Sequence, residues 1–255
     1  MRSGDSWFST PVHWLTDQVC IELVGCGGTG SAMLDELFRM HYLLTRLGHP
    51  GLMVRAWDAD QVQSANVGRQ RFWPADVGWN KAELLIARYN GFGGTPWRAV
   101  PEHLGAEVCA GLRCHLIISC VDDPQVRVMI GEQGAVANRG ETLWLDTGND
   151  HDSGQVILGH WQGREAVEGG LPNVLDLYPG LRAQHREERQ SCSTEEAISR
   201  QDFGINQRVA AEASGLLWRM LRHGGIERHG AFIYQSEGEV LPLRIGEQYW
   251  SSFAA

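Results

Sequence analysis

The chain has 255 residues, of which 43% are hydrophobic, enough for one large α/β domain or two small ones with a sizeable core. Its formal net charge of −9 argues against non-specific electrostatic binding of nucleic acid, although a local basic pocket can still bind phosphates. Residues 1–20 lack the apolar stretch of a signal peptide, and no later stretch reaches transmembrane length. We therefore expect a soluble, cytoplasmic protein with neither a nucleic-acid nor a membrane partner.

The first predicted unit is a strand, a tight turn, a helix and a second strand. Residues Val19–Val24 form a short apolar run rich in β-branched side chains, and the glycine-rich stretch Gly25–Gly30 follows at once. This order is typical of a strand that turns directly into a helix. Residues at helical spacing follow at Leu34, Leu37, Phe38, His41 and Leu44. A second apolar run, Leu52–Trp57, predicts the next strand, which ends at Asp58.

A polar segment, residues 59–80, separates this unit from a further helix and a buried strand. The helix is predicted from the spacing of Ala82, Leu85, Ile86 and Tyr89. The strand is the run Leu116–Val121, whose continuous apolar character is typical of a parallel sheet covered on both faces. Because Asp122 and Asp123 follow this run, we expect carboxylates at the carboxyl end of a central strand.

The second half of the chain combines strands with one long helix. The elements expected are strands at Thr142–Leu145 and Gln155–His160, a helix at Asn206–Leu221, and a hairpin of Phe232–Gln235 with Val240–Leu243. Gly224 and Gly225 end the helix. The segment Glu165–Ser199 has little periodicity and fits a long loop that crosses the protein surface.

The glycine turn is the first sign of chemistry. Glycines at positions 25, 27, 28 and 30 permit a tight bend, so that a phosphate can meet the amides at the start of the following helix. Asp58 ends the second strand, where a carboxylate can accept hydrogen bonds from ribose hydroxyls. These features suit a nucleotide site, and at this point an NAD-dependent dehydrogenase is an equal alternative. The alternative without a function is that the glycines form an ordinary strand-to-helix turn and that Asp58 is a solvated acid at a strand end.

The polar segment separates the nucleotide alternatives. Asn66, Arg69 and Gln70 lie close together in the sequence, and Lys81 follows soon after. Cleavage of a triphosphate between its α and β phosphates needs cations, which Arg69 and Lys81 supply. Asn66 and Gln70 can position polar oxygens. A hydride-transfer site has no need for this cluster.

These residues resemble the signatures of the ThiF/MoeB and ubiquitin-activating (E1-like) superfamily. Residues 58–70 resemble its D-x-D-x-V-x-x-S-N-x-x-R-Q signature, and Gly78 with Lys81 matches a downstream G-x-x-K. Residues 120–123 stand where the family has C-T-D-N at a strand end. With the glycine turn, these elements run in family order across residues 19–127. The resemblance implies a Rossmann-like adenylation fold: an α/β protein with a mainly parallel sheet, helices on both faces and an extended C-terminal half.

Carried over residue by residue, the resemblance implies a role for each matching position. Asp58 binds the ribose of ATP, and Asp122 holds magnesium. Asn66, Arg69 and Lys81 contact phosphates. A carboxylate such as Asp122 also suits magnesium on chemical grounds, because it faces the crevice where a hard cation bridges phosphate oxygens. The alternative for Asp122 is a cap for the helix that follows.

Over nearly its full length the chain resembles the ThiF-family proteins of bacterial PRTRC gene systems, for example at residues 49–51, 66–70, 155–159 and 206–207. That resemblance implies a small ubiquitin-like (β-grasp) protein as partner, with a conjugating-enzyme-like protein and a JAB-type peptidase as companions. A homodimer is expected by analogy. We expect residues 1–255 to form one domain. Its expected parts are a nucleotide-binding half at 1–130, a partner-binding and dimerisation half at 131–255, and a crossover loop at about 165–199.

The six cysteines form no C-x-x-C pair, so we expect no structural zinc. Cys192 is the candidate acyl acceptor, because activating enzymes of this class often place a cysteine at the end of such a loop. A thiolate near the start of a helix is also favoured electrostatically and can attack an acyl-adenylate. An inert, half-buried thiol is the alternative. We expect the remaining cysteines to be mostly buried thiols.

The sequence therefore predicts an ATP-dependent enzyme that adenylates the C-terminal carboxylate of a small ubiquitin-like protein, with thioester formation on Cys192 left open as a second step. Arg69, Lys81 and Asp122 are the other predicted catalytic residues. An NAD-dependent oxidoreductase leaves these three residues unexplained. A non-catalytic scaffold with this fold is the third alternative, and it has no need to keep the phosphate-binding residues.

Overall fold

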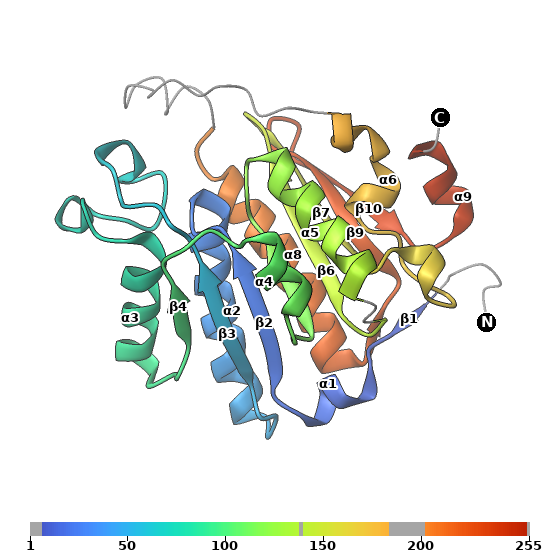
Figure 1. The fold of residues 1–255 in the computed structure, drawn as a ribbon, viewed down its shortest axis with the longest axis horizontal. Helices are drawn as coiled ribbons and strands as arrows, with labels where there is room; N and C mark the ends of the chain where they lie inside the picture. The colour runs from blue at the N-terminus through green and yellow to red at the C-terminus, as the bar shows by residue number, and fades with distance from the viewer. Residues whose placement is uncertain (1–6, 138–139, 184–201, 254–255) are drawn as a thin grey trace.

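The computed structural model describes residues 7–137, 140–183 and 202–253, and its centre is an eight-stranded sheet (Figure 1). The strands follow the order β10-β9-β7-β6-β5-β2-β3-β4 across the sheet. Their bounds are Val19–Val24 (β2), Leu52–Trp57 (β3), Arg98–Val100 (β4), Leu116–Ser119 (β5), Leu143–Asn149 (β6), Ser153–His160 (β7), Arg228–Tyr234 (β9) and Glu239–Arg244 (β10). A separate two-stranded sheet pairs β1 (Phe8–Ser9) with β8 (Gly225–Ile226).

The sheet is parallel from β4 to β6 and antiparallel from β6 to β10. Val24 of β2 lies beside Trp57 of β3 and Ser119 of β5, so these parallel strands end at one level. The chain passes from β2 to β3 on one side and later places β5 on the other. The order of strands therefore reverses at β2, and in open α/β sheets ligands bind in the crevice outside such a reversal.

Helices cover both faces of the sheet, as predicted. In Figure 1, α2 (Gly28–Arg46) and α8 (Ile205–His223) lie together behind it, while α4 (Ala106–Gly111) and α5 (Pro124–Ala137) lie in front. α3 (Lys81–Gly93) packs beside β4. The shorter helices are α1 (Val12–Thr16), α6 (Val174–Leu177) and α9 (Glu247–Trp250). None of the described helices combines the length and the apolar character needed to cross a membrane.

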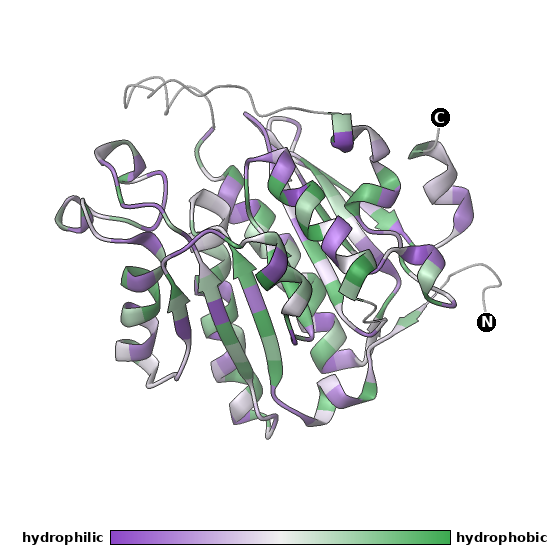
Figure 2. Cartoon of the chain, viewed as in Figure 1, coloured by the Kyte–Doolittle hydropathy of each residue, from purple (hydrophilic) through white to green (hydrophobic). Residues whose placement is uncertain are grey.

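The predicted helical pattern of α2 buries its leucines, whereas Phe38 and His41 are half-buried. In α2, Leu34 and Leu37 are fully buried and Leu44 nearly so, which confirms the apolar face. Figure 2 shows the same pattern across the fold, with hydrophobic strands in the centre and hydrophilic residues on the outer helix surfaces. Each fully buried leucine contributes about 1.5–3 kcal/mol of apolar transfer free energy. Gly224 ends α8 in a left-handed conformation, as expected.

The expectation of a surface loop at Glu165–Ser199 is wrong for its described part. There, α6 buries Val174, Leu175 and Leu177. Asn173 begins this helix by accepting hydrogen bonds from two backbone amides in its first turn. A helix of four residues is too short to create a recognisable period, so the sequence pattern missed it. Residues 184–201, which include Cys192, lie outside the described residues.

Candidate functional site

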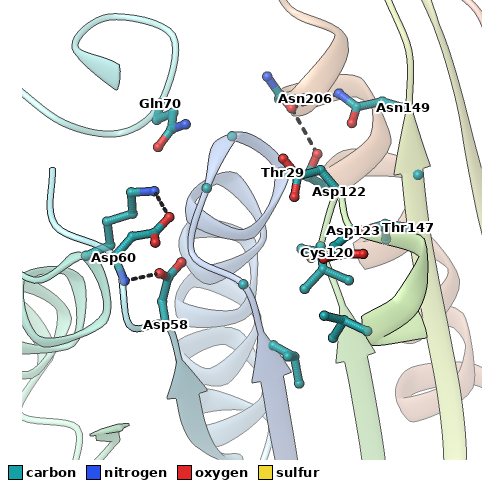
Figure 3. A pocket seen from close by; sticks show the side chains of 18 of the residues that line it. Thr29, Asp58, Asp60, Gln70, Cys120, Asp122, Asp123, Thr147, Asn149 and Asn206 are labelled. Atoms are coloured by element: carbon teal, nitrogen blue, oxygen red, sulfur yellow. Dashed lines mark hydrogen bonds and ion pairs between the residues drawn. The ribbon is translucent and has the colours of Figure 1, made fainter. Parts of the chain in front are cut away.

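A cleft of about 1320 Å³ opens at the carboxyl ends of β2, β3, β5 and β6. Most residues that the sequence selected line it: Gly25, Gly27, Gly28, Asp58, Asn66, Arg69, Gln70, Lys81 and Asp122. Figure 3 shows Asp58 and Asp60 on one side of the glycine loop, residues 25–28, and Asp122 on the other. Gly30 does not line the cleft, and Cys192 falls outside the described residues.

The glycines of the turn differ in what they make room for. Gly25 has a φ of 92°, and a Cβ there would lie 2.8 Å from the carbonyl oxygen of Cys120, the residue that follows β5. A Cβ on Gly30 would lie 1.8 Å from the carbonyl oxygen of Gly25. Gly30 therefore lets helix α2 pack against the turn, and because it does not line the cleft its predicted role in nucleotide binding stays a prediction. Gly27 lines the cleft and leaves room for a side chain, since a Cβ there would meet only Gln70 Nε2, at 3.9 Å.

Asp58 connects the end of β3 to the glycine loop. Its Oδ2 accepts a hydrogen bond from the Cys26 amide at 2.7 Å, and its Oδ1 accepts one from the Asp60 amide at 2.9 Å. Burial raises the pKa of Asp58, and the positive charge of Lys81 opposes that shift. Each carboxylate oxygen has a second lone pair, so Asp58 can still accept a hydrogen bond from a ribose hydroxyl. The geometry is compatible with the role expected from the sequence.

Lys81 is the first residue of α3, and its side chain is only 8% exposed. Its Nζ donates to Asp60 Oδ2 at 2.8 Å. Asn80 caps α3 by accepting from the Glu83 amide, and its Nδ2 donates to the carbonyl of Asp58. Sequence reasoning missed both Asp60 and Asn80 as supports for Lys81. An asparagine followed three residues later by a glutamate was the available signal, since that spacing is typical of a helix start.

The loop between β3 and α3 carries the other predicted phosphate residues. Asn66 Oδ1 accepts a hydrogen bond from the Gln63 amide at 2.8 Å, which closes a short turn of 3-10 helix. Arg69 Nη1 makes a long 3.5 Å contact with the Ala65 carbonyl. Gln70 Oε1 is buried and has no hydrogen-bond partner among the described residues. Because buried polar atoms are normally hydrogen-bonded, this oxygen fits a site that receives a ligand hydroxyl, amine or bound water.

The two acids after β5 have different surroundings. Asp123 Oδ1 accepts a hydrogen bond from the Gln125 amide at 2.9 Å, so Asp123 supplies a cap at the start of α5. Asp122 is exposed and lines the cleft. The described residues contain no group of three His, Cys, Asp or Glu side chains that could hold a metal ion by themselves. A lone carboxylate still suits Mg²⁺, which usually takes one or two carboxylates together with substrate phosphates and water.

A buried ion pair that sequence reasoning missed joins the ends of β5 and β6. Arg127 Nη2 donates to the carbonyls of Val121 and Thr147, at 2.9 and 3.1 Å. Its Nε lies 3.3 Å from Asp146 Oδ1, and Asp146 is fully buried. Burial raises the pKa of Asp146, while the charge of Arg127 and a hydrogen bond from Ser119 oppose the shift. An aspartate directly after the apolar residues 143–145 was the one signal in the sequence.

Residues from the second half of the chain complete the cleft. Among them are Gly148, Asn149, Gly154, Gln155, Asn206, Phe232 and Tyr234. The Thr29 hydroxyl donates to Asn206 Oδ1 at 2.9 Å (Figure 3). Asn149 Nδ2 donates to the same oxygen, also at 2.9 Å. The cleft therefore draws on both of the halves, 1–130 and 131–255, into which the sequence analysis divided the chain.

Burial raises the pKa of two cysteine thiols, Cys26 in the glycine loop and Cys120 at the cleft. Cys26 is fully buried, and burial raises the pKa of its thiol well above the usual value. Cys120 lines the cleft, and burial raises its pKa to about 12. Since the thiolate is the reactive form, neither residue is activated for acyl transfer at neutral pH.

Comparison with known proteins gives consistent matches. The sequence profile of the ThiF family matches residues 16–217. Ubiquitin-like modifier-activating enzyme 5 of Oryza sativa subsp. japonica is 28% identical over 158 residues, which are 56% of this chain and 34% of that protein. This chain thus spans about a third of the length of that curated relative.

Solved structures share the fold. Selenomethionine PaaA has a TM-score of 0.62 at 14% identity, over 91% of this chain and 65% of that chain. MccB of E. coli with ATP has a TM-score of 0.59 at 13% identity, over 91% and 65% of the two chains. MccB with selenomethionine MccA has a TM-score of 0.61 at 15% identity and the same coverage. At such identities the likeness concerns the fold alone.

Proposed function

This chain belongs to the ThiF family, and on that premise we propose that it is an ATP-dependent activating enzyme that adenylates the C-terminal carboxylate of a small ubiquitin-like protein. One observation carries the proposal: Asp58, Arg69, Lys81 and Asp122 line one cleft around the glycine loop, at the reversal in strand order. A carboxylate for ribose, two cations for phosphates and a carboxylate for a divalent metal are the groups that adenylation with ATP needs.

In the proposed complex, the ribose of ATP lies against Asp58 and its phosphates cross the open side of Gly27. The start of α2 supports the phosphates, because the first amides of a helix have no partner within the helix. Arg69 and Lys81 neutralise phosphate charge, and Asp122 would hold the Mg²⁺ that accompanies ATP. The buried oxygen of Gln70 would accept a hydrogen bond from the ligand or from bound water.

The proposed reaction is a displacement at the α-phosphorus. A carboxylate oxygen of the partner's last residue forms a bond to that phosphorus, and the bond from the phosphorus to the oxygen bridging the α and β phosphates breaks. Pyrophosphate leaves and takes the bonding electrons with it. No general base is required, because the attacking carboxylate is already ionised at neutral pH. Arg69 and Lys81 act by stabilising the charge that builds up as pyrophosphate departs.

We propose that the attacking carboxylate binds in the part of the cleft that the second half of the chain forms. Gly148, Asn149 and Gly154 line it near the end of β6 and the start of β7. Two names among the similar proteins support a polypeptide substrate: one relative is an activating enzyme for a ubiquitin-like modifier, and one structure holds MccB together with MccA. Further proposals rest on the family resemblance alone. They are a homodimer, a conjugating-enzyme-like protein and a JAB-type peptidase as partners, and a thioester on Cys192.

A pyrophosphate-exchange assay tests the proposal. The chain, Mg²⁺, ATP and labelled pyrophosphate are mixed with purified β-grasp proteins that end in a free glycine carboxylate. Label is expected to enter ATP only when such a protein is present. The matched control is the same β-grasp protein with an amidated C-terminus, which has no nucleophile and is expected to give no exchange.

Calorimetry with ATP and NAD tests the alternative. ATP with Mg²⁺ is expected to bind more tightly than NAD. Binding of NAD at micromolar strength, together with no detectable binding of ATP, would overturn the proposal in favour of an oxidoreductase.

A further inference from the structure

Asn206 lies in the first turn of α8, and its side chain lies against the glycine loop from a distant part of the sequence. The residue is 6% exposed, although it is polar and lines the cleft. Its Oδ1 accepts hydrogen bonds from the Thr29 hydroxyl and from Asn149 Nδ2. One amide oxygen thus joins the start of α2, the end of β6 and the start of α8.

The same carboxamide explains why residue 28 is a glycine. A Cβ on Gly28 would lie 2.6 Å from Cγ, Oδ1 and Nδ2 of Asn206, and these are its three nearest atoms. Gly28 is absent from the glycines with positive φ, so its backbone conformation suits an L-residue. The requirement for glycine at this position is therefore steric, and Asn206 is the neighbour that imposes it.

The contact connects the two parts of the proposed reaction site. Thr29 and Gly28 belong to the segment proposed to hold phosphates, whereas Asn149 belongs to the segment proposed to hold the attacking carboxylate. Hydrogen bonds to a buried acceptor fix the relative position of the groups that donate them, because a lost bond leaves a buried polar atom unsatisfied. A shift of the glycine loop relative to β6 would break at least one of the two bonds.

We propose that Asn206 is a positioning residue that holds the glycine loop in register with the end of β6, and that Gly28 is glycine in order to admit Asn206 rather than a phosphate. The inference rests on the proposed function for the identity of the ligand. The structural part, a steric and hydrogen-bonded pairing of residues 28 and 206, concerns the chain alone. Productive alignment matters because small displacements of reacting groups cost large factors in rate.

A double-mutant cycle tests the pairing. Gly28→Ala, Asn206→Ala and the double variant are compared with wild type in ATP binding by calorimetry and in pyrophosphate exchange. Each single variant is expected to weaken ATP binding about tenfold, in the range of coupling expected for residues in direct contact. The double variant is expected to bind no more weakly than Asn206→Ala, because the alanine methyl at 28 then meets no carboxamide.

If the fold losses of ATP affinity in the two single variants multiply in the double variant, the inference is overturned. Residue 28 would then be glycine because of the phosphate and not because of Asn206. If Gly28→Ala fails to fold alone but folds together with Asn206→Ala, thermal melting curves support the inference, and no activity measurement is needed. Wild type that binds no ATP would overturn the proposed function, whereas wild type that binds ATP with fully multiplicative variants overturns this inference alone.

Variants of Thr29 separate positioning from simple stability. Thr29→Val keeps the shape of the side chain and removes the hydroxyl that donates to Asn206, while Thr29→Ser keeps the hydroxyl. For a positioning role, Thr29→Val is expected to lower kcat more than it raises KM for ATP, and Thr29→Ser is expected to restore most of the loss. Gln207→Ala is the matched control, because Gln207 is the exposed neighbour of Asn206 in α8. Equal activity of Thr29→Val and wild type would overturn the role of the hydrogen bond.

Discussion

Lys81 Nζ donates a 2.8 Å hydrogen bond to Asp60 Oδ2, so the buried cation of the cleft already has an anionic partner. The two side chains differ in exposure, at 8% for Lys81 and 60% for Asp60. The lysine is therefore fixed by its surroundings, and the exposed aspartate is the partner that can move aside. A phosphate that enters the cleft competes with Asp60 for the same ammonium.

Replacement of Lys81 by methionine is expected to lower pyrophosphate exchange by about two orders of magnitude, the scale for removal of one preorganised charge-stabilising group. Methionine keeps the buried apolar stem, so the fold is expected to survive. Asp60→Asn is the matched comparison: it removes the competing charge and is expected to leave ATP binding as tight as in wild type or tighter. Folded Lys81→Met with wild-type exchange would show that Lys81 does not serve phosphates.

Arg69→Ala is also expected to lower pyrophosphate exchange by about two orders of magnitude or more, because it removes the second cation from the proposed transition state. Arg71→Ala provides a control on the same loop, since Arg71 pairs with Asp35 and does not line the cleft. Exchange rates and thermal melts of both variants check the prediction. Equal losses in the two variants would indicate a general effect of charge on this loop rather than a phosphate contact.

Replacement by asparagine is expected to lower Mg²⁺-dependent turnover more at Asp122 than at Asp123. Asp122→Asn is expected to abolish Mg²⁺-dependent turnover while ATP binding falls less, because the metal contributes most as charge builds on pyrophosphate. Asp123→Asn keeps an oxygen that can accept from the Gln125 amide, so its loss of turnover is expected to be smaller. Turnover against Mg²⁺ concentration distinguishes them. An inactive Asp123→Asn beside an active Asp122→Asn would move the metal contact by one residue.

The affinity for ATP is expected to fall on acidification through Asp58. Burial raises the pKa of this carboxyl, so its proton binds at a higher pH than in an ordinary aspartate. The ionised form accepts hydrogen bonds from ribose on both oxygens, and protonation leaves a weaker, neutral acceptor. Affinity is therefore full above the raised pKa and falls as the pH falls through it.

The measurement is calorimetry with ATP and Mg²⁺ in steps below neutral pH, with Asp58→Asn as the control. The variant experiences the same titration of the phosphates of ATP but has no carboxyl at position 58. A difference between the two pH profiles therefore reports on Asp58. Identical profiles would remove Asp58 from the nucleotide site.

Cys192 is the predicted acyl acceptor, and it lies among residues 184–201, outside the described ones. Adenylation needs no protein nucleophile, so Cys192→Ala is expected to keep pyrophosphate exchange and to lose any covalent complex with the β-grasp partner. Non-reducing gels are expected to show a thiol-sensitive band of the summed mass in wild type only. Persistence of that band in Cys192→Ala, or its absence from wild type that forms adenylate, would return Cys192 to an inert role.

The sequence was sufficient for those features that depend on local pattern. The runs at 19–24 and 52–57 became β2 and β3 with the predicted bounds, because short, mainly apolar segments beside glycines favour a buried strand. Asp58 and Asp122 both reach the cleft because parallel strands end at one edge of a sheet. The family signatures supported the two cations, of which Arg69 lies on a loop without periodicity and Lys81 is the first residue of α3.

Tertiary structure alone decided how the parts of the cleft fit together. Only the fold assigns the helix cap to Asp123 rather than Asp122, the packing role to Gly30, and the neighbour of Gly28 to Asn206. The bond from Thr29 to Asn206 joins residues 177 positions apart, and it exists because α8 packs against α2. No local spacing encodes such a contact, since it depends on how two helices dock on the same face of one sheet.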